Sequence, residues 1–124
     1  MTLPMAVLLP TRRARVVIES PYSGEVEINL AYLRACMRDS LLRGEAPYAS
    51  HGLYTQPGVL DDNEPDERAL GIAAGFAWRV VADRTVFYVD RGWSSGMLAG
   101  LQDCKELGLP FVVRTLPGCP VEWL

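Results

Sequence analysis

Two segments of the chain share one pattern, in which an apolar run passes through a short loop of small residues into a helical segment. They are residues 16–24, VVIESPYSG, and residues 86–96, VFYVDRGWSSG. Short apolar runs rich in β-branched and aromatic residues are typical of strands buried on both faces, as in parallel sheets. Parallel strands are joined by helical crossovers, so the pattern predicts an α/β fold.

The rest of the chain continues the alternation of strands and helices. Strands are predicted at residues 15–19, 46–50, 85–90 and 110–114, and helices at residues 25–43, 65–82 and 94–108. The order βαβαβαβ with short connections predicts a parallel sheet with helices on both faces. Helical spacing predicts that the first helix faces the sheet with Val26, Leu30, Leu33, Met37 and Leu41.

Length and composition narrow the class of protein. The 124 residues suit one domain, and we expect an N-terminal arm over residues 1–14 and a single α/β domain over residues 15–124. A net charge of −3 argues against a nucleic-acid binder, and no apolar run is long enough to span a bilayer. The three cysteines, Cys36, Cys104 and Cys119, predict neither a disulfide framework nor a zinc site, so a cytoplasmic location is expected.

In a parallel α/β sheet, ligands bind beyond the carboxyl ends of the strands. Three segments that follow predicted strands should lie at this edge of the sheet: residues 20–24, 50–51 and 90–96. With the acidic loop before the second long helix, they supply the candidate ligand-binding residues Ser20, Tyr22, Ser23, Gly24, His51, Asp61, Asp90, Gly92, Trp93, Ser94, Ser95, Gly96 and Met97.

Each of these segments also has a plain structural interpretation. Ser94 and Ser95 suit an anion-binding helix N-terminus or an ordinary N-cap. Tyr22 suits a crevice floor or packing on the first helix. His51 suits a ligand contact, a general base or a structural histidine. The acidic run over residues 61–67 fits a solvated helix start better than a metal site, and no metal or cofactor is expected.

Three stretches together resemble the nucleoside 2-deoxyribosyltransferase-like superfamily, especially its small uncharacterised bacterial and phage members. They are residues 18–24, the segment from Ser50-His51 to Asp61-Asp62, and the segment from Gly96-Met97 to Gly108-Leu109-Pro110. The resemblance covers about residues 15–114. It implies a flavodoxin-like three-layer α/β/α sandwich with a four- to five-stranded parallel sheet, a homo-oligomer, and a pocket for a nucleoside or nucleotide.

The chain departs from the superfamily at the catalytic position. In the enzymes, a Glu that attacks the sugar C1′ lies eight residues before the Gly of a Gly-x-Pro motif, which here leads from Gly108 back to Gly100. Asp103 follows nearly one turn later and is expected to point elsewhere. Without the nucleophile, the covalent route to base exchange is lost.

The resemblance therefore implies a protein that binds a nucleotide- or nucleoside-like ligand without catalysis. If the chain is phage-encoded, it would sequester a nucleotide signal in the host cytoplasm. Two alternatives stay open. One is an N-glycosidase or 2-deoxyribosyltransferase that recruits Asp61, Asp62 or Glu67. The other is a structural or interaction domain with a vestigial crevice.

Overall fold

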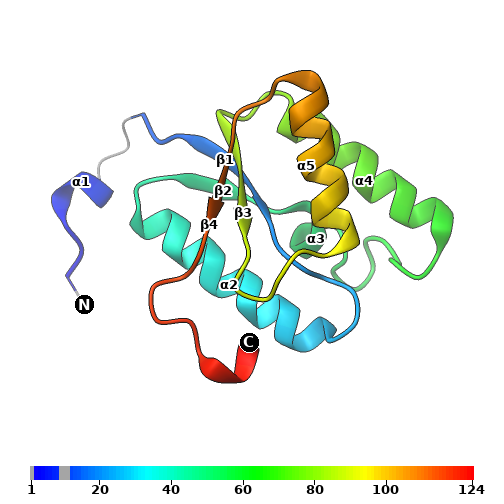
Figure 1. The fold of residues 1–124 in the computed structure, drawn as a ribbon, viewed down its shortest axis with the longest axis horizontal. Helices are drawn as coiled ribbons and strands as arrows, with labels where there is room; N and C mark the ends of the chain where they lie inside the picture. The colour runs from blue at the N-terminus through cyan, green and yellow to red at the C-terminus, as the bar shows by residue number, and fades with distance from the viewer. Residues whose placement is uncertain (1, 9–11) are drawn as a thin grey trace.

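The computed structural model describes residues 2–8 and 12–124 and is built on a parallel sheet (Figure 1). Its strands are β1 (Arg15–Glu19), β2 (Ala46–Tyr48), β3 (Arg84–Tyr88) and β4 (Phe111–Arg114). They lie in the order β2-β1-β3-β4, and every neighbouring pair is parallel. In the register, Val17 of β1 lies between Tyr48 of β2 and Thr85 of β3.

Helices cover both faces of this sheet. α2 (Val26–Leu42) lies on one face, and α4 (Pro65–Arg79) and α5 (Ser95–Leu107) lie on the other. The shorter helices are α1 (Met5–Leu8), which lies apart from the sheet in Figure 1, α3 (Ser50–Leu53) and the 3-10 helix η1 (Val121–Trp123). Successive side chains of a strand point to opposite faces. Val86 and Tyr88 of β3 pack with α2, whereas Phe87 packs with α5. The predicted three-layer α/β/α architecture with a parallel sheet is therefore confirmed, with four strands.

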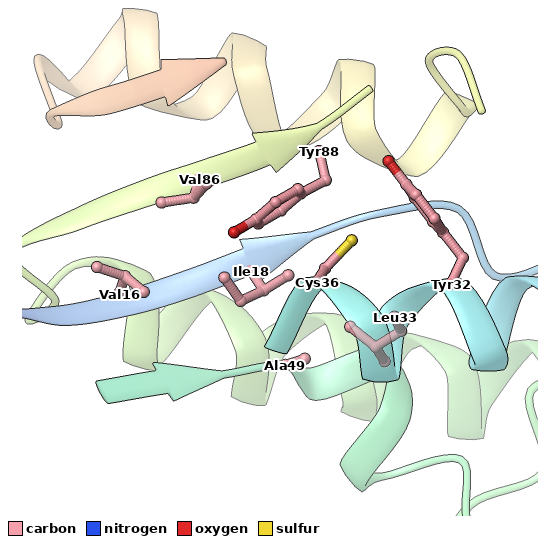
Figure 2. Packing of buried hydrophobic residues seen from close by; sticks show 8 residues of the cluster. All are labelled: Val16, Ile18, Tyr32, Leu33, Cys36, Ala49, Val86 and Tyr88. Atoms are coloured by element: carbon pink, nitrogen blue, oxygen red, sulfur yellow. The ribbon is translucent and has the colours of Figure 1, made fainter. Parts of the chain in front are cut away.

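The main core lies between the sheet and α2 (Figure 2). Val16 and Ile18 of β1 meet Leu33 and Cys36 of α2 there, and all four are at most 2% exposed. This burial differs from the predicted apolar stripe, because Leu41 is 47% exposed while Asn29 and Ser40 are buried. The polar residues tolerate the core position because both are hydrogen-bonded, Asn29 to loop carbonyls and Ser40 to a carboxylate.

The C-terminal segment closes the same face of the sheet. Trp123 packs edge-on against Tyr32 of α2 with ring centroids 6.0 Å apart, and Leu116 and Cys119 join the same core. The Asp90 carboxylate holds this segment by accepting hydrogen bonds from the Leu116 amide at 3.0 and 3.1 Å.

The N-terminal arm, the cysteines and the apolarity of the helices were also considered from the sequence. The predicted N-terminal arm includes residues 1 and 9–11, which lie outside the described residues. Cys36 and Cys104 are buried free thiols, and Cys119 is a half-buried one. Across residues 2–8 and 12–124, each helix is too short or too polar to cross a membrane.

Candidate ligand-binding site

A cavity opens beyond the carboxyl end of β1, between α3, α4 and the N-terminus of α5. Nine residues singled out in the sequence line it: Ser20, Tyr22, Ser23, His51, Asp62, Ser94, Ser95, Gly96 and Met97. They come from the three segments expected at this edge of the sheet and from the loop before α4. The structure thus brings together most of the predicted candidates.

A neutral hydrogen-bonded pair forms one wall of the cavity. Ser20 is 4% exposed, and its Oγ lies 2.8 Å from Nε2 of His51 on α3. Burial lowers the pKa of His51 to about 4, so the imidazole is neutral at pH 7. A neutral imidazole has one donor and one acceptor nitrogen, and the pair is therefore suited to uncharged polar groups such as hydroxyls or a base edge.

Gly75 positions this pair by letting α4 approach α3 closely. A Cβ at Gly75 would lie 2.8 Å from Oγ of Ser50, the residue before His51. Two glycines one turn apart in this helix, Gly71 and Gly75, favour close packing against the sheet or another subunit; the neighbour of Gly75 is α3. A larger side chain there would push α3, and His51 with it, away from the cavity.

The N-terminus of α5 forms a second wall. Ser94 is its N-cap, with Oγ accepting a hydrogen bond from the Met97 amide at 3.2 Å. Capping leaves the amides of Ser95 and Gly96 without partners inside the helix. Ser95 is exposed, and both residues line the cavity. The N-cap and the anion-binding interpretations are therefore compatible, because one serine caps the helix while free amides follow it.

Three charged side chains that are not among the predicted candidates, Glu19, Arg79 and Asp103, form the floor of the cavity. Arg79 at the end of α4 donates to Oε1 of Glu19 at 2.8 Å and to Oδ2 of Asp103 at 3.1 Å. The Arg79 and Glu19 side chains are only 9% and 13% exposed. Burial raises the pKa of Glu19, and the Arg79 guanidinium opposes that rise. The one available signal was that Glu19 ends the apolar run of β1 and that Arg79 follows ten residues without charge in α4.

Arg79 also fills the space beside Gly100, where the superfamily's nucleophile is expected. A Cβ at Gly100 would lie 3.0 Å from Nη2 of Arg79 and 3.6 Å from the ring of Phe87. The expectation that Asp103 points elsewhere is wrong, because Asp103 lines the cavity. Three residues make nearly one helical turn, so Asp103 shares the face of Gly100.

Five candidate residues do not line the cavity: Gly24, Asp61, Asp90, Gly92 and Trp93. Asp90 accepts a 2.6 Å hydrogen bond from the Tyr32 hydroxyl and faces the C-terminal segment. The Trp93 ring packs on Phe87 with centroids 5.2 Å apart.

In the acidic segment around the start of α4, some candidate residues line the cavity and others do not. Asp61 accepts a hydrogen bond from the Asn63 amide at 3.0 Å. Of the three carboxylates considered for catalysis, only Asp62 lines the cavity. Glu67 borders a smaller neighbouring hollow that includes His51. Among the described residues, His, Cys, Asp and Glu side chains form no group of three or more that could hold a metal ion.

Comparison with known proteins supports the fold and identifies the family. No curated protein sequence matches the chain. The fold is similar to a solved structure of a 2-deoxyribosyltransferase from the psychrotolerant bacterium Bacillus psychrosaccharolyticus, with a TM-score of 0.57 and 17% sequence identity. The match covers 87% of this chain and 77% of that one, and at this identity it establishes a deoxyribosyltransferase-like fold. The model of a family described as a domain of unknown function (DUF7768) matches residues 14–114, and the chain belongs to this family.

Proposed function

We propose that the cavity binds a nucleoside- or nucleotide-like ligand and that the chain does not exchange its base. One observation carries the second half of this proposal. The position expected for the nucleophilic carboxylate is Gly100, and the space beside it holds the Arg79 guanidinium. A cation bound to two carboxylates cannot attack a sugar carbon.

The chemistry of the walls supports the first half of the proposal. The Ser20–His51 pair offers hydrogen bonds to an uncharged sugar or base. The free amides at the start of α5 and the exposed Arg68 side chain at the rim favour an anionic group such as a phosphate. A protein that holds such a ligand intact would act by sequestration, which is the role proposed here if the chain is phage-encoded.

The direct test is retention of ligands by the purified chain. We expect at least one member of a panel of nucleosides, nucleotides and cyclic nucleotides to bind and to be recovered intact by chromatography and mass spectrometry. Replacing Tyr22 by alanine or Ser95 by alanine should weaken binding about 10-fold or more, which corresponds to about 1.4 kcal/mol. Thr115→Ala, at an exposed hydroxyl outside the cavity, is the matched control. No retained ligand, or full affinity in both cavity variants, would contradict the proposal.

Binding of a nucleoside without phosphate should be nearly independent of pH between about 5.5 and 8. The reason is that His51, with a pKa lowered by burial to about 4, keeps one protonation state across this range. Isothermal titration at several pH values measures this directly. An inflection near pH 6.5 would show that His51 titrates normally and is not buried as described.

A second candidate function is hydrolysis of an N-glycosidic bond, favoured by the position of Glu19. Its carboxylate lies at the cavity floor, where Oε1 bonds to Arg79 and Oε2 has no hydrogen-bond partner among the described residues. The ligand panel decides between the two functions, because this one releases free base. Glu19→Gln should then abolish the release, whereas Asp62→Asn would abolish it if the recruited carboxylate is Asp62.

A further inference from the structure

The Glu19 carboxylate has one oxygen open to the cavity. Its Oε1 accepts a 2.8 Å hydrogen bond from Nη2 of Arg79, whereas Oε2 has no hydrogen-bond partner among the described residues. Oε2 is nevertheless not fully buried, unlike Nε of Arg79, which is buried without a partner. Because Glu19 lines the cavity, this free oxygen is available to a ligand.

The carboxylate is held in place before any ligand binds. Glu19 is the last residue of β1, and Arg79 is the last residue of α4. Arg79 also donates to Oδ2 of Asp103 on α5 at 3.1 Å, so that residues of three elements fix the direction of the free oxygen. A hydrogen-bonding group that is held in position loses little freedom on binding and therefore contributes more to affinity.

The charge of the cavity floor disfavours a phosphate there. Glu19 and Asp103 are two carboxylates around one arginine, and Asp62 adds a third carboxylate to the cavity lining. Because like charges repel, a phosphate is favoured instead at the first turn of α5, where the amides of Ser95 and Gly96 are free. The floor suits a neutral group that donates hydrogen bonds.

The geometry of α5 places the sugar of a nucleotide over this floor. A Cβ at Gly100 would lie 3.0 Å from Nη2 of Arg79, so Gly100 marks the level of the floor along α5. Gly100 follows Ser95 by five residues, which is about 7.5 Å along the helix axis. In a nucleotide the sugar joins the phosphate to the base. A phosphate at Ser95 therefore brings the sugar next to the floor and leaves the base further away.

We propose that Glu19 binds the 2′,3′-diol of a ribose, so that the cavity prefers ribonucleotides to 2′-deoxyribonucleotides. This inference rests on the proposed function and names the sugar. Oε2 of Glu19 accepts a hydrogen bond from one hydroxyl, and the neighbouring Ser20–His51 pair bonds the other. A carboxylate also contacts the ribose 2′-hydroxyl in dinucleotide-binding α/β folds. A 2′-deoxy sugar would leave one of these groups without its partner, and sites of this kind discriminate strongly against an analogue that lacks the hydroxyl.

Isothermal titration of the full chain with matched nucleotides tests the proposal. The 5′-monophosphates of adenosine, guanosine, cytidine and uridine are compared with their 2′-deoxy counterparts. The ribonucleotide that binds best should bind about 10- to 100-fold more tightly than its 2′-deoxy form, as expected for one hydrogen bond to a charged group. This ratio is measured on the wild-type chain, so it does not depend on the stability of a variant.

Glu19→Gln tests whether the carboxylate causes the preference. The amide keeps the size of the side chain but removes the charge, and the ratio of the two affinities should fall towards one. Glu106→Gln makes the same chemical change at an exposed position of α5 outside the cavity and should keep the wild-type ratio. Circular dichroism checks that both variants are folded.

The outcomes separate this inference from the proposed function. Equal affinity of the wild-type chain for the ribose and 2′-deoxyribose forms would overturn the inference and leave the binding function standing. Binding of neither form would overturn both. A folded Glu19→Gln chain that keeps the ratio would also overturn the inference. So would one that changes only the preference between the cytidine and uridine nucleotides, because Glu19 would then contact the base.

Discussion

Replacing Glu45 by glutamine is expected to lower the free energy of unfolding by about 3 kcal/mol at pH 7. Glu45 is 4% exposed, and its carboxylate accepts hydrogen bonds from Arg114 at 2.8 and 2.9 Å, from Arg84 at 2.7 Å and from Ser40 at 2.7 Å. The amide would leave two arginines, one of them with a side chain only 13% exposed, without a counter-charge. Breaking a buried pair in this way costs far more than losing a surface ion pair.

Urea unfolding of the wild-type and Glu45→Gln chains measures the difference in their free energy of unfolding. Glu106→Gln is the matched control, since Glu106 is exposed on α5 and contacts only the neighbouring Gln102 side chain among the hydrogen bonds described. Its effect should stay within about 0.5 kcal/mol. A Glu45→Gln chain as stable as the Glu106→Gln chain would show that the carboxylate does not hold β3 and β4 to the start of β2.

The difference in the free energy of unfolding between wild type and Glu45→Gln should also depend on pH. Burial alone would raise the pKa of Glu45, but the hydrogen bonds from Arg114, Ser40 and Arg84 outweigh it and lower the pKa from 4.5 to about 2. A group whose pKa is lower in the folded state stabilises the fold above its unfolded pKa and loses this contribution as the pH falls. The gap between wild type and Glu45→Gln should therefore be full above about pH 4.5 and shrink towards pH 2.

The fold follows from the sequence wherever a local pattern is complete. The first strand was predicted with its exact bounds, because its apolar run is bracketed by charged and turn-forming residues. The helix over α3 was missed, since four residues are too few to show a period. The predicted face of α2 holds for Leu30, Leu33 and Met37, which pack in the core. It fails at Leu41, which is exposed, while Asn29 and Ser40 lie inward. Their partners are loop carbonyls and Glu45, which a pattern of apolar residues does not reveal.

The site was predictable to the extent that topology determines it. Ser20, His51 and Ser95 follow or flank strand ends, so the rule for parallel sheets brings them together. The same rule placed Asp90 in the candidate site, but its carboxylate is used by Tyr32 and Leu116 on the other face. The charged floor could not be predicted, because Arg79 meets partners 60 and 24 residues away on separate elements.

Arg79→Met is expected to destabilise the fold at pH 7 by about 3–5 kcal/mol, since it leaves the Glu19 carboxylate buried without its counter-charge. Burial already raises the pKa of Glu19, and removal of the opposing guanidinium should raise it further. A carboxyl whose pKa is higher in the folded state costs stability as the pH rises above its unfolded value of 4.5. The destabilisation should therefore be largest near neutral pH and smaller near pH 4.5, where Glu19 takes up a proton.

A double-mutant cycle separates this charge effect from lost packing. Glu19→Gln combined with Arg79→Met removes both charges, and the double variant should be more stable at pH 7 than Arg79→Met alone, with a coupling of about 2 kcal/mol or more. Asp103→Asn is the control within the same cluster; its side chain is 43% exposed, so it should cost no more than about 1 kcal/mol. If the Arg79→Met penalty is unchanged by Glu19→Gln and does not vary with pH, Arg79 acts through packing beside Gly100, and the cavity floor is not held by charge.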